Sequence, residues 1–361
     1  MSPKVRRLRN RVKSAVASAI AKAHDRGLAG TRGQYRPLVI GYHRVVEDFE
    51  AEAKVEMPSM LTSLRMFKQH LDCLGRSFRF VSLDDIGERL SNGLSFHEPV
   101  VAITFDDGYQ DVYELALPVL ERKGIPAAMF VVTDLVGQPA WQVHDKLYHL
   151  VAKAFRRWDD PRAKMFGLLS ELGLPAHDLA RRAIANPMVA VSTLLPELPQ
   201  ADVRRLMRGL ELSVGNGFHN VPLTVTWEMV DDMRRRGFTI GSHTRTHVSL
   251  PVESPERIAA ELEESKAGLE RHLGERIDHF AYPGGHFNTA VVEAVARAGY
   301  RFAYTACRHD DLRHPLLTVH RLLLWEGSSV NGDGEFIPDI LSCQAHDLWP
   351  PARRCERVHR S

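Results

Sequence analysis

The stretch Val100-Val-Ala-Ile-Thr-Phe-Asp-Asp-Gly108 decides the fold of this chain. Its first part, Val100–Phe105, is a nearly continuous apolar run, which is typical of a strand buried on both faces of a parallel sheet. Two carboxylates, Asp106 and Asp107, follow the strand directly. Gly108 then permits a tight turn. The sequence therefore predicts a buried strand that ends in polar chemistry.

The same alternation of strand and helix continues on both sides of this stretch. A helix over 113–123 and a strand over 127–132 complete a βαβ unit. The other expected strands cover 37–42, 78–82, 238–240, 280–282, 302–305 and 317–324, and the other helices 66–74, 84–90, 227–236, 254–273 and 289–298. About seven strands that alternate with helices predict an α/β fold, a deformed (β/α) barrel, with its chemistry at the C-terminal ends of the strands.

Three regions depart from this alternation. Residues 138–222 are rich in Leu, Arg and Ala without a comparable buried strand, which predicts a helical insertion. Residues 1–36 carry ten Lys and Arg against one acidic residue and predict a basic, helical arm. Residues 331–361 are rich in Gly, Pro and Asp and then basic, which predicts a C-terminal tail. The barrel with its insertion is expected to span 37–330.

Composition excludes several classes of protein. The 361 residues are 44% hydrophobic and 25% charged, which is ordinary for a globular protein and excludes a disordered chain or a collagen-like repeat. No apolar run approaches the roughly 20 residues of a membrane-spanning helix. The four cysteines form no CxxC pair, so we expect reduced thiols without a metal or redox role.

The basic arm bears on localisation. Its apolar stretch, 15–21, is short and rich in Ala, which is weaker than the core of a secretion signal. We therefore expect a cytoplasmic chain. The arm either touches an anionic membrane surface or is a solvated helix without a specific partner. No recognition module for nucleic acid is present, and none is expected to bind.

Two further polar clusters follow predicted strands. Gly241-Ser-His-Thr-Arg-Thr-His247 holds two histidines four residues apart, a spacing that suits two ligands of one ion. Phe280-Ala-Tyr-Pro-Gly-Gly285 makes a rigid turn with accessible backbone amides. A carboxylate and two imidazoles would leave a coordination position for water, and zinc suits this set, with cobalt, nickel or iron still open. Such a centre hydrolyses amides or esters, with the spare carboxylate as base.

With these three segments the sequence resembles the polysaccharide deacetylase family, carbohydrate esterase family 4, which includes the chitooligosaccharide deacetylases of nodulation. Their order and spacing match over most of 37–325 outside the insertion. The early Gly41-Tyr-His-Arg-Val45 and Trp141 are similar to the branch that acts on bacterial exopolysaccharides. The resemblance implies metal-dependent removal of N- or O-linked acetyl groups from a carbohydrate, here a bacterial polysaccharide or oligosaccharide precursor.

The resemblance also implies roles for individual residues. Asp106 would be the base that activates a metal-bound water, and the metal ligands would be Asp107, His243 and His247. The backbone N–H of Tyr109 would help to stabilise the oxyanion. The substrate groove would include Tyr282, Pro283, Gly284, His43 and Trp141.

Two features depart from the family pattern. Many members have an Arg two residues before the Pro of the third motif, where Ala281 stands here, and Arg321 is the candidate to supply that charge. The general acid of the family is often a His near the end of the domain, and His320 matches it loosely. Without His320, Asp106 would serve as both base and acid.

Two other functions fit parts of the same pattern. The scaffold could hydrolyse a different amide, either a cyclic amide or a formylated lipid-linked sugar. A barrel without catalysis could bind glycan alone, but such a relic is expected to lack a ligand or the base, and all four positions are present here.

Overall fold

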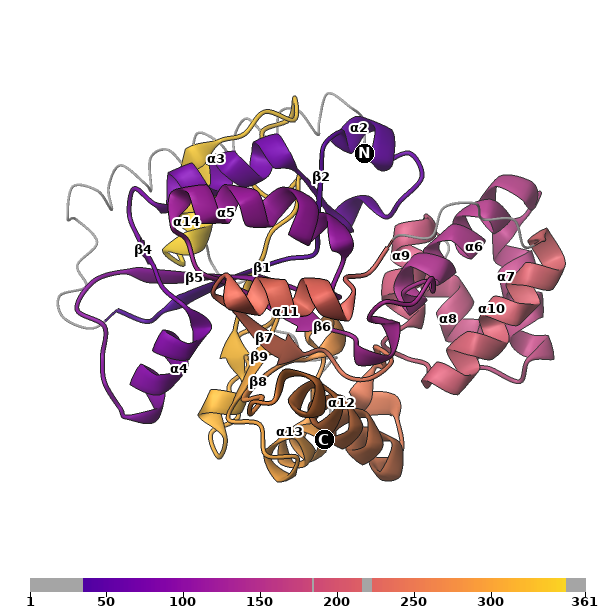
Figure 1. The fold of residues 1–361 in the computed structure, drawn as a ribbon. Helices are drawn as coiled ribbons and strands as arrows, with labels where there is room; N and C mark the ends of the chain where they lie inside the picture. Colours follow the sequence, from indigo (N-terminus) through magenta and orange to yellow (C-terminus); the bar gives the residue numbers. More distant parts are fainter. Residues whose placement is uncertain (1–34, 184, 216–222, 349–361) are drawn as a thin grey trace.

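Parallel strands form the centre of the molecule, and helices surround them (Figure 1). The computed structural model describes residues 35–183, 185–215 and 223–348. The predicted basic arm, apart from its last two residues, and the end of the predicted tail lie outside the described residues. In the part of the chain that is described, no helix is both long and apolar enough to cross a membrane.

The main sheet is nearly closed. Its strands run in the order β10-β9-β8-β7-β6-β5-β1-β11, with β4 beside β5. Their bounds are β1 (Leu38–Tyr42), β4 (Arg79–Phe80), β5 (Val100–Phe105), β6 (Ala127–Val131), β7 (Phe238–Ser242), β8 (His279–Ala281), β9 (Phe302–Thr305), β10 (Val319–His320) and β11 (Leu322–Leu323). Every pairing is parallel. Because only Arg321 separates β10 from β11, the two ends of the sheet meet at this residue. The predicted deformed (β/α) barrel is confirmed.

Burial on both faces explains why β5 is an uninterrupted apolar run. All six of its residues are buried. Val101, Ile103 and Phe105 belong to the large hydrophobic cluster that also contains residues of the surrounding helices. Val100 and Ala102 belong to a separate cluster with residues of other strands. Since alternate side chains of a strand point to opposite faces, both faces need apolar residues.

The helices outside the insertion cover the sheet (Figure 1). Their bounds are α2 (Phe49–Glu52), α3 (Leu64–Leu74), α4 (Leu83–Ser91), α5 (Leu117–Lys123), α11 (Trp227–Arg235), α12 (Pro255–Leu273), α13 (Thr289–Arg297) and α14 (Pro338–Ala345). A π-helical turn, Val112–Ala116, precedes α5. The sequence did not predict α14, which lies in the expected tail and packs against α3. A second, two-stranded sheet of β2 (Arg44–Val46) and β3 (Leu61–Ser63) was also not predicted.

The insertion is helical and has a core of its own. It contains α6 (Val143–Arg157), α7 (Pro161–Glu171), α8 (Ala176–Ala183), α9 (Pro187–Leu194) and α10 (Gln200–Val214). These helices pack as a group beside the barrel (Figure 1). Their buried residues form one hydrophobic cluster that also includes Tyr109 of the barrel. The insertion therefore attaches next to Asp106 and Asp107.

Candidate active site

The predicted polar clusters meet at the C-terminal ends of the strands. Asp106 and Asp107 follow β5. The backbone N–H of Asp106 donates to the carbonyl of Tyr42 at the end of β1, with 2.9 Å from N to O. His243 follows β7 and donates its backbone N–H to the last residue of β6, Val131, at 2.9 Å. Because parallel strands end at the same edge, residues far apart in sequence come together there.

Asp107, His243 and His247 form a compact triad. The Oδ1 atom of Asp107 lies 3.5 Å from His243 Nε2 and 3.2 Å from His247 Nε2. One ligand atom from each residue falls within 4.8 Å of the others. Asp107 is 1% exposed, yet neither carboxylate oxygen accepts a hydrogen bond from the described residues. A buried carboxylate without donors is costly, and a divalent cation would satisfy it, so this donor set fits a metal.

The electrostatics of the triad fit the same role. Burial raises the pKa of Asp107, but His144 and His247 outweigh burial and hold it well below its usual range. Burial lowers the pKa of His243 to about 4. Asp107 is therefore ionised and His243 is neutral at ordinary pH, which are the states that bind a metal.

Backbone contacts fix the two histidines. His243 donates Nδ1–H to the carbonyl of Ala281 across 2.8 Å, which leaves Nε2 directed at Asp107. The loop that leads to His247 has two residues with positive φ, Thr244 at 67° and His247 at 57°. Glu261 of α12, fully buried, accepts the backbone N–H groups of two loop residues at 2.8 and 2.9 Å. These contacts hold a strained loop in the shape that the triad needs.

Arg321 supplies the charge that the third motif lacks. Its guanidinium donates two hydrogen bonds of 2.7 Å to the two oxygens of Asp106. It also donates to Thr104 Oγ1 at 3.1 Å and lies over the Phe130 ring. Burial raises the pKa of Asp106, but Arg321 and His243 outweigh burial and lower it below its usual value. Since Arg321 is 1% exposed, it holds the proposed base and is not open to substrate.

Removing this arginine should destabilise the fold. We expect Arg321→Met to lower the free energy of unfolding by about 3–5 kcal/mol, because Asp106 would be a buried charge without a partner. The double variant Arg321→Met/Asp106→Asn should recover part of the loss, because the amide carries no charge. Urea unfolding of the three proteins measures both effects. A double variant no more stable than Arg321→Met would place the loss in packing instead.

The sequence predicts two further histidines near the site, His43 and His320, and in the structure they have different charged neighbours. His43 follows β1 and acts electrostatically on Asp106, Asp107 and His144. Burial lowers the pKa of His320 to about 4, and its main charged neighbours are Arg308, Asp347 and Asp310. Within the described residues, no hydrogen bond or ion pair joins His320 to the triad.

The third motif shapes the wall of the site. The Tyr282 side chain is fully buried and donates to the Leu317 carbonyl at 2.9 Å, so it packs in the core and does not face substrate. Pro283 and Gly284 form a turn in which Gly284 has φ of 63°. A Cβ at Gly285 would come within 2.4 Å of Ala306, which explains a glycine there. Of Tyr282, Pro283, Gly284 and Gly285, only Gly284 is exposed, so the turn presents backbone atoms and no side chain at the surface.

The insertion brings two residues to the site that sequence reasoning missed. His144 and Asp145, at the start of α6, are both nearly fully buried. Tyr109 was expected to act through its backbone, but its buried hydroxyl lies 2.8 Å from His144 Nε2 and 2.6 Å from Asp145 Oδ2. Trp141 is half-buried and lies just before α6, and its ring packs edge-on against His149 of that helix. The one available signal was that His144 and Asp145 stand together just after Trp141.

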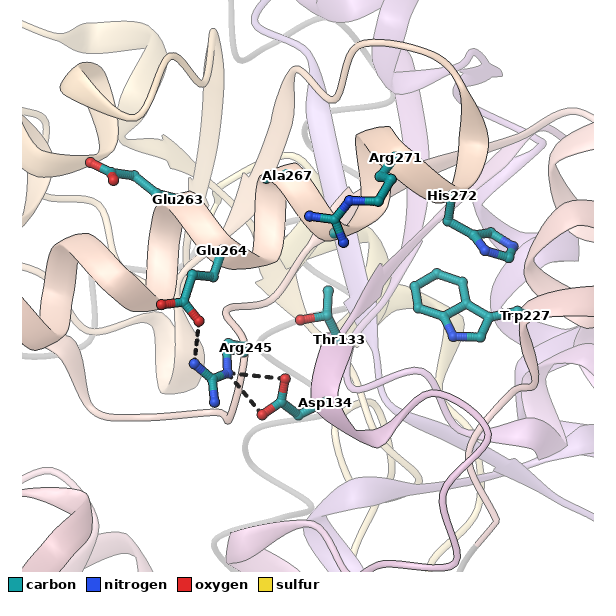
Figure 2. Close-up of a pocket in the computed structure, with 10 residues that line it drawn as sticks. Thr133, Asp134, Trp227, Arg245, Glu263, Glu264, Ala267, Arg271 and His272 are labelled. Atoms are coloured by element: carbon teal, nitrogen blue, oxygen red, sulfur yellow. Dashed lines mark hydrogen bonds and ion pairs between the residues drawn. The ribbon is translucent and has the colours of Figure 1, made fainter.

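A cavity of about 790 Å³ is lined in part by Arg245, a residue of the loop that joins His243 to His247 (Figure 2). Arg245, between the two histidines in sequence, donates to both oxygens of Asp134 and pairs with Glu264. The ring centroids of Trp227 and His272 lie 4.2 Å apart. None of the triad lines this cavity, so it is separate from the candidate metal centre.

Comparison with known proteins agrees with this arrangement. Residues 94–303, more than half of the chain, match the family model described as polysaccharide deacetylase. The chain is 21% identical over 314 residues to YxkH of Bacillus subtilis (strain 168), named for the same activity, with 81% of this chain and 82% of that protein covered.

Two solved structures share the fold. IcaB from Ammonifex degensii has a TM-score of 0.53 at 20% identity, covering 86% of this chain and 97% of that chain. The Streptococcus pyogenes deacetylase PplD, in complex with acetate, has a TM-score of 0.52 at 19% identity, covering 84% and 97%. The family match, together with the strand-end cluster, shows that the chain belongs to the polysaccharide deacetylase family, hydrolases of carbon–nitrogen or ester bonds.

Proposed function

We propose that this protein is a metal-dependent hydrolase that removes acetyl groups from a bacterial polysaccharide or oligosaccharide precursor. The observation that carries the proposal is Asp107, which is buried, faces His243 and His247, and has no hydrogen-bond donor to either oxygen from the residues that the structure describes. Asp106, held ionised by Arg321, lies next to it. A cation site beside a fixed carboxylate is an arrangement that supports amide and ester hydrolysis.

Each residue then has a separate task. Asp107, His243 and His247 would hold the cation, most favourably zinc. When bound, such a cation lowers the pKa of water and polarises an acetyl carbonyl. Asp106 accepts the proton of the attacking water, while Arg321 keeps both of its oxygens in place. Charge that develops on the acetyl oxygen is stabilised by the backbone N–H of Tyr109, which donates to no backbone carbonyl of the described residues.

The leaving group needs a proton, and we propose that His43 delivers it. His43 acts electrostatically on Asp106 and Asp107, whereas the charges that act most on His320 are those of Arg308 and Asp347. Loss of a general acid costs about 100- to 10,000-fold in rate.

We therefore expect His43→Ala to lower kcat within that range and His320→Ala to lower it by less than about tenfold. Steady-state kinetics on one acetylated oligosaccharide compares the two variants. The opposite ranking would return the role to His320, and two active variants would assign both proton transfers to Asp106.

The relatives support the proposed substrate class. YxkH is named as a polysaccharide deacetylase, and the deacetylase PplD was solved in complex with acetate. A panel of N-acetylated chito-oligosaccharides, an O-acetylated polysaccharide and a formylated sugar tests the proposal. Release of acetate from the first or second supports it and identifies the bond. Formate release alone would favour the formylated lipid-linked sugar, and no release with intact cation binding would favour a cyclic amide.

A further inference from the structure

The segment Gln142–Asp145, through which the helical insertion enters α6, contacts Asp107 twice. Gln142 donates its side-chain N–H to the backbone carbonyl of Asp107 at 2.8 Å. His144 Nε2 lies 3.6 Å from Asp107 Oδ2. Both Gln142 and His144 are more than nine-tenths buried. Asp107 itself has φ of 70°, a left-handed conformation that an aspartate adopts at a cost. One segment therefore contacts both the backbone and the side chain of a strained residue.

The two oxygens of Asp107 have different surroundings. Oδ1 is the oxygen close to His243 and His247, at 3.5 and 3.2 Å. Oδ2 is the oxygen close to His144. His144 also packs against His247, with 4.8 Å between ring centroids, although it is not part of the compact triad. The carboxylate is thus placed with one oxygen toward the cation site and the other toward the insertion.

Hydrogen bonding decides which nitrogen of His144 carries the proton. Tyr109 donates its hydroxyl proton to Asp145 Oδ2 at 2.6 Å, so its oxygen is free to accept from His144 Nε2 at 2.8 Å. Nε2 is then the protonated nitrogen, and the buried Nδ1, which has no partner in the described part of the chain, is an empty acceptor. The reverse tautomer would bury an unpaired N–H donor, which is rarer than an unpaired acceptor. Nε2 donates this proton to Tyr109, and Asp107 Oδ2 lies 3.6 Å from the same protonated nitrogen.

We propose that His144, held by Tyr109 and Asp145, is a positioning residue of the metal centre: it fixes Asp107 through Oδ2 and leaves Oδ1 to the cation. This inference rests on the proposed cation site. At 3.6 Å the contact is electrostatic and not a hydrogen bond. The helical insertion thereby sets the affinity of a centre whose ligands all come from the barrel. Residues that orient metal ligands from outside the coordination shell contribute about 10- to 100-fold in affinity.

The test measures cation binding without substrate. Metal-free protein is titrated with Zn²⁺ by isothermal calorimetry against a competing chelator. We expect His144→Leu to weaken binding by about 10- to 100-fold. His144→Gln, whose amide N–H reaches close to the position of Nε2, should recover most of the loss. Tyr109→Phe should weaken binding in the same direction, and combined with His144→Leu it should add little.

A matched control separates this role from general damage to the core. His70 is also fully buried and paired with a tyrosine, with 3.1 Å from Nδ1 to the hydroxyl of Tyr42, but it does not contact the triad. His70→Leu should leave the affinity for Zn²⁺ unchanged. Circular dichroism confirms that each variant is folded.

Three results would overturn the inference. Equal affinity of wild type and His144→Leu would mean that His144 does not act on the centre. A changed visible spectrum of the Co²⁺-loaded His144→Leu variant would make His144 a direct ligand instead of a positioning residue. Absence of Zn²⁺ binding in the wild type would overturn the proposed function as well. The first of these results, in which the wild type still binds Zn²⁺, would overturn only this inference.

Discussion

Asp106→Asn should lose turnover by about 100- to 10,000-fold while it still binds one divalent cation. The amide cannot accept the proton of the attacking water, but the cation ligands Asp107, His243 and His247 are unchanged. The amide oxygen can still accept one of the two hydrogen bonds from Arg321, which keeps the shape of the site. Acetate release measured together with bound Zn²⁺ separates the loss of the base from the loss of the centre.

The control for this substitution is a second aspartate that is paired with an arginine, and it is partly buried. Asp111 accepts from Arg44 Nε at 2.7 Å, and burial raises its pKa to about 6. Asp111→Asn introduces the same chemical change without touching the proposed base, so turnover should change by less than about tenfold. Turnover near the wild-type level in Asp106→Asn would remove Asp106 from the mechanism. A similar loss in both variants would point to the fold.

His243→Ala should lose the cation and the activity together. His243 is a proposed ligand, and removing a ligand should cost more than the 10- to 100-fold typical of an outer contact. Binding also stabilises: Zn²⁺ at 100 times its Kd should raise the stability of the wild type by about 2.7 kcal/mol. His243→Ala should show no such increase at the same concentration. Thermal unfolding with and without Zn²⁺ measures it, and His70→Leu again serves as control.

A His243→Ala variant that is stabilised by Zn²⁺ as much as the wild type would contradict the ligand assignment. Loss of activity with full cation binding would instead place His243 beside the base, since it also acts on Asp106.

Local patterns were sufficient to predict the barrel. The apolar run of β5 and the repeated polar residues after strands follow from burial on both faces and from the meeting of parallel strand ends. The sequence indicates Arg321 as a candidate only because Ala281 stands where many members of the family have an arginine. In the structure Arg321 donates to both oxygens of Asp106. Its position depends on closure of the sheet between β10 and β11, which no short window of sequence contains.

The contribution of the insertion could not be predicted from the sequence. His144 and Asp145 begin an ordinary amphipathic helix, and only packing of that helix against Tyr109 brings them to the site. The same limit applies to Tyr282, whose motif predicted a groove residue while its ring packs in the core. A motif gives the order of residues along a strand end, but tertiary packing decides which side chains face the cavity.

The most direct test of the account is a titration of the metal-stripped protein with Zn²⁺ in the presence of an acetylated oligosaccharide. Bound Zn²⁺ and released acetate are measured in the same samples. We expect no release from the stripped protein, a rise in proportion to occupancy, and saturation at one ion per chain. Full release from the stripped protein, or release that does not follow occupancy, would contradict a catalytic cation at Asp107, His243 and His247.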